Sequence, residues 1–254
     1  MLREEFYDDP HFDYRRYWNG RLYEHLSEVI AIKKLIEQIP TSRRNNLLEV
    51  GAGFGRIAKI YSPLFKECVL LEPSNKLINQ ARNYLSHRKN LSFCQGKAEN
   101  LPFDDSCFDL VLMIRILHHL IRPGKVFQEV NRVLKPKGFL ILEMANKAHI
   151  KARMVAWMRR KALDKNPVDI RSRNNLIKKT IPFINYHPDW IENLLEEHGF
   201  RIRSKLSVSN FRHSLIKRIF PLRLLLYLED RLQLKLAPYN FGPSVFFLAQ
   251  KTDT

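Results

Sequence analysis

A glycine-rich stretch near residue 50 is the first part of the sequence whose residue types could do chemistry. Gly51, Gly53 and Gly55 follow an apolar run that contains Glu49. Glycine permits a tight turn and lets a ligand approach the backbone, and the start of a following helix offers free N–H groups. Glu72 comes 21 residues after Gly51, at the end of the next apolar run, where an acid can bind both hydroxyls of a ribose. The spacing favours a nucleoside-like ligand over a merely solvated carboxylate.

Two common phosphate-binding patterns do not fit this stretch. Arg56 stands where the dinucleotide fingerprint GxGxxG needs its last glycine, and no GxxxxGK[ST] occurs in the chain. The three cysteines form no CxxC pair, so we interpret them as small buried apolar residues. The sequence offers no metal-ligand pattern, and we expect no metal site.

Strand-like and helix-like patterns alternate around the glycines. Seven apolar runs read as strands: 47–50, 69–71, 91–94, 108–113, 139–143, 200–208 and 245–249. Helices are predicted from Gly55 to about Lys66 and over 75–86, 124–134 and 188–199, and 135–138 is predicted to be a turn. Continuously apolar strands that alternate with helices indicate an α/β protein with a parallel sheet covered on both faces. Ligands bind beyond the carboxyl ends of such strands.

The segment from Leu47 to Glu143 resembles the class I S-adenosylmethionine-dependent methyltransferases of the type-11 group. The resemblance rests on motifs at 48–56, 71–74, 96–105, 108–111, 117–120 and 129–138. It implies a Rossmann-like, seven-stranded, mostly parallel doubly wound sheet with helices on both faces. Helical insertions would follow strands 5 and 6. It also implies S-adenosylmethionine as the cofactor.

The resemblance assigns a role to residues at each strand end. Glu49 and the turn Gly51, Ala52, Gly53 and Gly55 would hold the methionine end, and Glu72 the ribose. Pro73 would pack on the adenine, Ala98 and Glu99 would lie along its edge, and Ile114 or Arg115 would approach from the fourth strand. Lys97 stands where the family commonly has an Asp that accepts from the adenine amino group, and lysine cannot accept.

Two further groups could take part in the reaction. His118 and His119 follow the fourth strand, and histidine is a suitable general base at neutral pH. In the resembling family a histidine here can also contact ligands without a catalytic duty. In the aromatic N-terminal segment, Tyr17, Trp18 and Arg21 are candidates for a lid over the cofactor. The alternative is an amphipathic helix packed on the core.

Positive charge is concentrated in the C-terminal part. The formal net charge is +17, and residues 147–181 hold 11 Lys and Arg against two acids. These basic residues could bind phosphates, or could form a solvated helix face. Residues 211–236 are cationic and strongly apolar. They could lie peripherally on an anionic membrane, or pack on the sheet edge or in a dimer.

We expect one domain over 1–254, with an N-terminal helical lid segment (1–45), a cofactor-binding core (46–146) and a C-terminal part with the insertions (147–254). The leading hypothesis is an enzyme that methylates an oxygen or nitrogen atom of a small-molecule or glycan-type acceptor. One alternative is an RNA methyltransferase that uses the basic half. Another is a non-catalytic cofactor-binding or membrane-surface scaffold. The acidic, aromatic N-terminus does not resemble a signal peptide, so we expect a cytoplasmic protein, with peripheral membrane contact as an addition.

Overall fold

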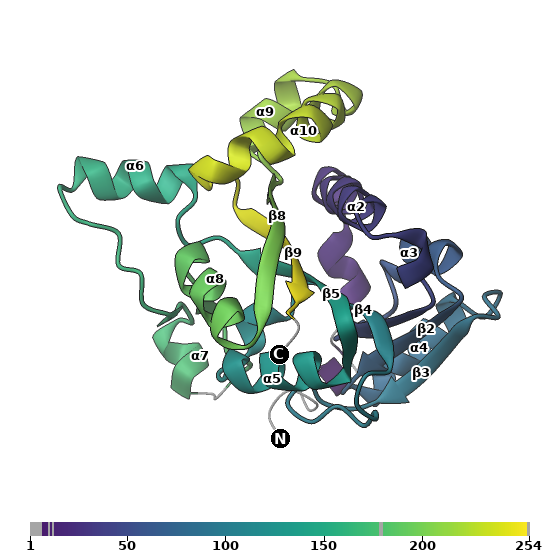
Figure 1. The fold of residues 1–254 in the computed structure, drawn as a ribbon. Coiled ribbons are helices and arrows are strands. Elements are labelled where there is room, and N and C mark those ends of the chain that lie inside the picture. Colours follow the sequence, from purple (N-terminus) through teal and green to yellow (C-terminus); the bar gives the residue numbers. More distant parts are fainter. Residues whose placement is uncertain (1–6, 10, 12, 178–179, 253–254) are drawn as a thin grey trace.

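A single seven-stranded sheet organises the chain. The computed structural model describes residues 7–9, 11, 13–177 and 180–252. The strand order is β3-β2-β1-β4-β5-β9-β8 (Figure 1). The strands are β1 (Asn46–Val50), β2 (Glu67–Glu72), β3 (Leu91–Gln95), β4 (Phe108–Met113), β5 (Leu134–Ala145), β8 (Phe200–Val208) and β9 (Ser244–Lys251). The first five are parallel, β9 is antiparallel to β5, and β8 is antiparallel to β9. The predicted mostly parallel sheet is confirmed.

Helices cover both faces of the sheet, as predicted. The apolar core of one face includes residues of α5 (Pro123–Val133) and α8 (Pro188–Glu197). The core of the other face includes residues of α2 (Leu22–Glu37), α3 (Ala58–Tyr61) and α4 (Asn75–Tyr84). Ser74 caps α4 as expected, because its hydroxyl accepts from the amide of Leu77 at 3.1 Å.

Two helical insertions follow β5 and β8, also as predicted. The first holds α6 (Ile150–Met158), α7 (Arg173–Ile177) and a small sheet of β6 (Val168–Asp169) with β7 (Ile184–Asn185). The second holds α9 (Ser214–Ile219), α10 (Leu222–Leu236) and the 3₁₀ turn η5 (Ala237–Tyr239). Both leave the sheet at its carboxyl edge, because β5 and β8 end there. The guanidinium of Arg153 donates to the carbonyl of Tyr239 at 2.7 Å, which joins α6 to the end of α10. Figure 1 shows α6, α9 and α10 together at the top.

Short 3₁₀ turns complete the chain, and two predicted boundaries are wrong. The 3₁₀ turns are η1 (Tyr14–Trp18), η2 (Thr41–Arg43), η3 (Ser62–Leu64) and η4 (Leu117–His119). The helix predicted up to Lys66 is only α3 followed by η3. The predicted turn at 135–138 lies inside β5. The pairing with β4 jumps there from Leu134 to Phe139, and Lys137 is left-handed with φ 59°, so these residues form a bulge within the strand.

Within the described ranges, none of the helices combines the length and hydrophobicity that a membrane span requires. The division into a lid segment, a core and a C-terminal part remains a prediction.

Candidate active site

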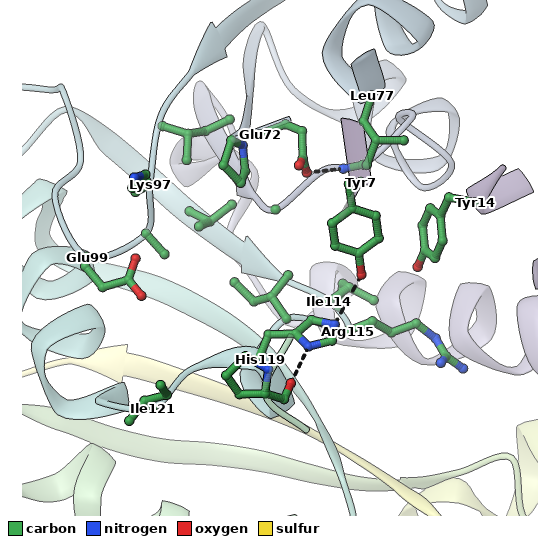
Figure 2. A pocket seen from close by; sticks show the side chains of 18 of the residues that line it. Tyr7, Tyr14, Glu72, Leu77, Lys97, Glu99, Ile114, Arg115, His119 and Ile121 are labelled. Atoms are coloured by element: carbon green, nitrogen blue, oxygen red, sulfur yellow. Dashed lines mark hydrogen bonds between the residues drawn. The ribbon is translucent and has the colours of Figure 1, made fainter. Parts of the chain in front are cut away.

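A cavity of about 600 Å³ lies where several strands end (Figure 2). It gathers residues that are distant in the sequence, many of which lie at or just after the end of a strand of the parallel sheet. Of the predicted residues, it is lined by Gly51, Gly53, Glu72, Pro73, Ala98, Glu99, Ile114, Arg115 and His119. The segments after β1, β2, β3 and β4 thus meet at one cavity, as the topology requires.

The glycine turn forms one wall and is shaped for close approach. Gly51 and Gly53 have φ of +74° and +57°, which few residues other than glycine adopt. A Cβ on Gly51 would collide with the side chain of Ile116, and one on Gly53 would lie 3.4 Å from the ring of Tyr14. The amides of Gly51 and Ala52 donate to the carbonyl of Leu71 at 2.8 and 3.1 Å. Those two N–H groups are therefore already bonded within the protein and are not offered to a ligand.

Glu72 is a buried carboxylate on the wall of the cavity. It accepts from the amide of Gly53 at 2.8 Å and from the amide of Ser74 at 3.1 Å. A carboxylate can accept about four hydrogen bonds, so these two bonds orient the group without exhausting it. The side chain is fixed by the same turn that carries the glycines.

Glu49 has a different environment from the one its sequence position suggested. It is absent from the cavity lining and accepts from the hydroxyl of Tyr61 on α3 at 2.6 Å. Neighbouring residues of a strand point to opposite faces, and Val50, the next residue of β1, lines the cavity. Burial raises the pKa of Glu49 to about 7. Its contact with a cofactor remains a prediction that this geometry does not favour.

His119 lies between a carbonyl group and a hydroxyl group that come from distant segments of the chain. Its Nδ1 lies 2.8 Å from the carbonyl oxygen of Pro182, and its Nε2 lies 3.3 Å from the hydroxyl of Tyr7 (Figure 2). A carbonyl oxygen only accepts, so Nδ1 carries the proton, and in the neutral ring Nε2 accepts from Tyr7. His118 is outside the cavity lining, and its ring packs between His119 and Phe183, with centroids 4.0 and 4.5 Å away.

The predicted lid residues form a second layer behind the cavity. Tyr17, Trp18 and Arg21 are not among its lining residues. The guanidinium of Arg56 lies 3.5 Å from the centroid of the Trp18 ring, and that of Arg115 lies 4.8 Å from it. Both arginines bond the buried carboxylate of Glu28, at 2.6 and 2.7 Å. Gly55 and Ala52 likewise support the turn from outside the lining.

Other residues that line the cavity were not predicted from the sequence. They are Tyr7, Tyr14, Ile121, Arg122, Lys125 and Pro182, together with the apolar residues Val50, Leu71, Leu77 and Ile116. The aromatic density of the N-terminus was the available signal for Tyr7 and Tyr14. Lys97, the departure from the family pattern, also lines the cavity beside Glu99 (Figure 2).

A second cavity of about 450 Å³ adjoins the first. Tyr7 and His119 line both cavities. The other walls of the second cavity come from the first insertion: Ile170, Arg171, Ser172, Asn175, Thr180, Ile181 and Phe183. Across the part of the chain that the structure describes, no three His, Cys, Asp or Glu side chains gather as a metal site would require.

Comparisons with known proteins agree with this geometry. Residues 48–142 match the family model of the methyltransferase domain. The uncharacterized methyltransferase YcgJ of Bacillus subtilis is 32% identical over 110 residues, which is 42% of this chain and 44% of that protein. Its crystal structure has a TM-score of 0.57 at 18% identity and covers 89% of this chain and 99% of that one. Residues 48–142 therefore form a class I S-adenosylmethionine-dependent methyltransferase domain.

The curated relatives match only part of this chain. A malonyl-[acyl-carrier protein] O-methyltransferase from Marinomonas is 25% identical over 132 residues, 51% of this chain and 49% of that protein. The chain aligns with about half the length of the Marinomonas enzyme and with slightly less than half the length of YcgJ. S-adenosylmethionine is the cofactor that the family implies, whereas the methyl acceptor differs among its members.

Proposed function

We propose that this methyltransferase transfers a methyl group from S-adenosylmethionine to an oxygen or nitrogen atom of a small-molecule or glycan-type acceptor. The observation that carries the proposal is the position of His119, which lines both cavities and whose Nδ1 faces the carbonyl of Pro182, so that the neutral form of the ring would accept at Nε2. The first cavity holds the cofactor, and the second holds the acceptor.

The residues of the first cavity fit S-adenosylmethionine. The bare glycine turn admits the methionine end closely, and its carbonyl oxygens can accept from the ammonium group. The oriented carboxylate of Glu72 suits the ribose hydroxyls. Pro73, Ala98 and Ile114 supply apolar surface for the adenine. Glu99 provides the carboxylate near the adenine edge that Lys97 cannot provide.

The cofactor, when bound, supplies a methyl group activated by a positively charged sulfur. The acceptor's lone pair forms the new bond to the methyl carbon, and the electrons of the broken carbon–sulfur bond remain on the sulfur. Nε2 of His119 takes the proton that the acceptor hydroxyl or amine loses. Because Nδ1 donates to Pro182, the ring is held in the tautomer that can accept this proton. Tyr7 must then yield its bond to the acceptor.

The walls of the second cavity match an acceptor with an apolar face and several hydroxyls. Ile181 and Phe183 offer apolar and aromatic surface, on which a sugar or ring compound can lie. Ser172, Asn175 and Thr180 offer side chains that can bond hydroxyl groups. The guanidinium of Arg171 pairs with Asp169 at 2.7 Å, so this site is not tuned to bind a polyanion. RNA is therefore the less favoured acceptor.

The test combines binding with transfer. Calorimetric titration should give micromolar binding of S-adenosylmethionine and of its demethylated product. Incubation with methyl-labelled cofactor and pooled small-molecule, glycan and tRNA fractions should label a small molecule or glycan on oxygen or nitrogen. The variant His119→Asn should bind the cofactor normally but lose at least about tenfold in turnover. Labelled tRNA or a carbon-bound methyl group would contradict the acceptor class. Cofactor binding without transfer to any fraction would favour the scaffold.

A further inference from the structure

The helix α10 buries polar side chains on its inner side and exposes apolar side chains on its outer side. Its side toward α2 and β8 buries Leu225, but also the polar side chains of Glu229 and Gln233. Its outer side exposes Leu224, Tyr227 and Leu234, the last by 61%. An amphipathic helix of a globular protein normally does the reverse. The outer side therefore presents apolar groups that nothing in the described chain covers.

The polar inner side is a built anchor and not a packing defect. Glu229 accepts from the hydroxyl of Tyr23 at 2.6 Å and from the amides of Ser209 and Asn210 at 2.7 and 3.0 Å. The amide of Gln233 donates to the carbonyl of Ser27 at 3.0 Å. These bonds fix the rotation of α10 about its axis, and so they hold Leu224 and Leu234 outward.

The neighbouring helices extend the same apolar surface. On α9, Leu215 and Ile219 are 59% and 69% exposed, and that helix buries no residue. The helix α6, which is joined to the end of α10 through Arg153, also buries none and exposes Trp157 by 80%. We call the exposed sides of α6, α9 and α10 the apolar-basic face (Figure 1). Large apolar side chains exposed on several helices are typical of a contact surface.

The charge of this face is of one sign. Residues 150–161 hold five Lys and Arg and no acid, and residues 212–235 hold six against Glu229 and Asp230. Glu229 is buried on the inner side, and Asp230 pairs with Lys34 of α2 at 2.9 Å. Arg223, Arg231 and Lys235 are exposed, as are Leu224 and Leu234 of α10. The apolar groups are thus surrounded by cations.

We propose that the apolar-basic face docks this methyltransferase on an anionic lipid bilayer. Leucine, isoleucine and an exposed tryptophan can enter the boundary between headgroups and acyl chains, while arginine and lysine bind anionic headgroups. A second copy of the chain is a poor occupant, because a symmetric contact would oppose cations with cations. An RNA would neutralise the cations but would leave the leucines without a partner. The insertions that carry this face leave the sheet at its carboxyl edge, where the strands end at the first cavity. Docking would therefore bring the active site close to the membrane.

Co-sedimentation of the full chain with vesicles tests the proposal. We expect at least tenfold stronger binding to phosphatidylcholine vesicles that contain about 30% phosphatidylglycerol than to pure phosphatidylcholine. About 0.5 M salt should weaken this binding. Two double variants address the face: Arg218→Glu with Arg223→Glu, and Ile219→Gln with Leu234→Gln. Each should reduce binding to the anionic vesicles at least tenfold.

A matched pair of charge reversals provides the control. Lys89 and Arg201 are exposed at the opposite, amino edge of the sheet, just before β3 and within the start of β8. Lys89→Glu with Arg201→Glu changes the net charge as much as the first double variant, and it should leave vesicle binding unchanged. If the Lys89/Arg201 pair lost as much vesicle binding as the Arg218/Arg223 pair, the effect would come from the net charge of the protein and not from this face. That result would overturn the proposal.

Further outcomes separate the rival occupants. A glutamine double variant that binds vesicles like the natural chain would overturn insertion of the apolar groups. A concentration-dependent dimer that the same variant dissociates would assign the face to a second copy, and tRNA binding lost only in the charge variant would assign it to RNA. Quenching of tryptophan fluorescence by brominated lipid, abolished in Trp157→Phe, supports docking even if a double variant fails to fold. The proposal does not depend on the methyl acceptor, because vesicle binding is measured without turnover.

Discussion

The hydroxyl of Tyr23 donates to the carboxylate of Glu229 at 2.6 Å, although the two residues are 206 positions apart. This bond ties α2 at the start of the chain to α10 near its end. The same hydroxyl accepts from the amide of Phe211 at 2.9 Å, so α2, α10 and the loop after β8 share one buried polar centre.

Removing the carboxylate should therefore destabilise the fold. Glu229→Ala leaves buried donors without partners, and we expect the free energy of unfolding to fall by about 3 kcal/mol. Leu234→Ala, one turn further along α10 but on its exposed side, should change the free energy by less than about 0.5 kcal/mol. Urea unfolding of both variants measures the difference. Similar values for the two would show that the inner side of α10 is not the anchor.

Glu72→Ala should weaken cofactor binding at least tenfold, which is about 1.4 kcal/mol. The substitution removes the acceptor proposed for the ribose and also frees the amide of Gly53. Calorimetry with the demethylated cofactor measures the effect. The control is Glu67→Ala, an exposed carboxylate at the other end of β2, which should bind normally. Unchanged binding in Glu72→Ala would contradict the proposed placement of the cofactor.

Trp18 should slow the escape of a bound cofactor. Its ring lies against the guanidinium groups of Arg56 and Arg115, and a cation–π contact of this kind contributes about 1 kcal/mol. Trp18→Ala should loosen the segment that carries Tyr14 over the glycine turn. We expect the dissociation rate of the demethylated cofactor to rise about fivefold, as measured by stopped flow. Trp18→Phe should have a smaller effect, and an unchanged rate in both variants would contradict the lid interpretation.

Glu49 should make stability depend on pH. Burial raises its pKa from 4.5 to about 7 in the folded chain. Unfolding therefore releases a proton between about pH 4.5 and pH 7, and the stabilisation from the protonated carboxyl is lost as the pH rises through this range. The loss is about 3 kcal/mol at most. Unfolding free energies at the two ends of the range should show a smaller decrease in Glu49→Gln. An identical decrease would mean that Glu49 is ionised throughout.

The sheet was predictable from the sequence because its central strands are continuously apolar and alternate with helices. The same property hid the direction of Glu49. In a strand buried on both faces, the pattern of apolar residues does not reveal which side chains point to the cavity and which to α3. The bulge in β5 was missed for a related reason, since Pro136 and Gly138 indicate a turn whether or not the strand resumes its pairing on either side.

The site was predictable wherever a residue directly follows a strand. The resemblance to the family supplied the roles, and the parallel topology brought Gly51, Glu72, Ala98 and Ile114 to one cavity. Tyr7 and Pro182 were beyond reach, because they meet His119 across 112 and 63 positions of the chain. Such contacts depend on how a terminal segment and an insertion fold back on the core, which local patterns do not encode.

The carbonyl of Pro182 has a consequence for redesign. The segment that walls the second cavity, which we propose as the acceptor site, also places the carbonyl that faces Nδ1 of His119. Grafting another loop between β5 and α8 would exchange the acceptor walls and, in the same step, release the imidazole to either tautomer. Under this proposal, the choice of acceptor and the ability of His119 to accept a proton at Nε2 depend on the same loop. A replacement loop that lacks the carbonyl of Pro182 would change the acceptor site but would no longer hold His119 in the tautomer that accepts the proton.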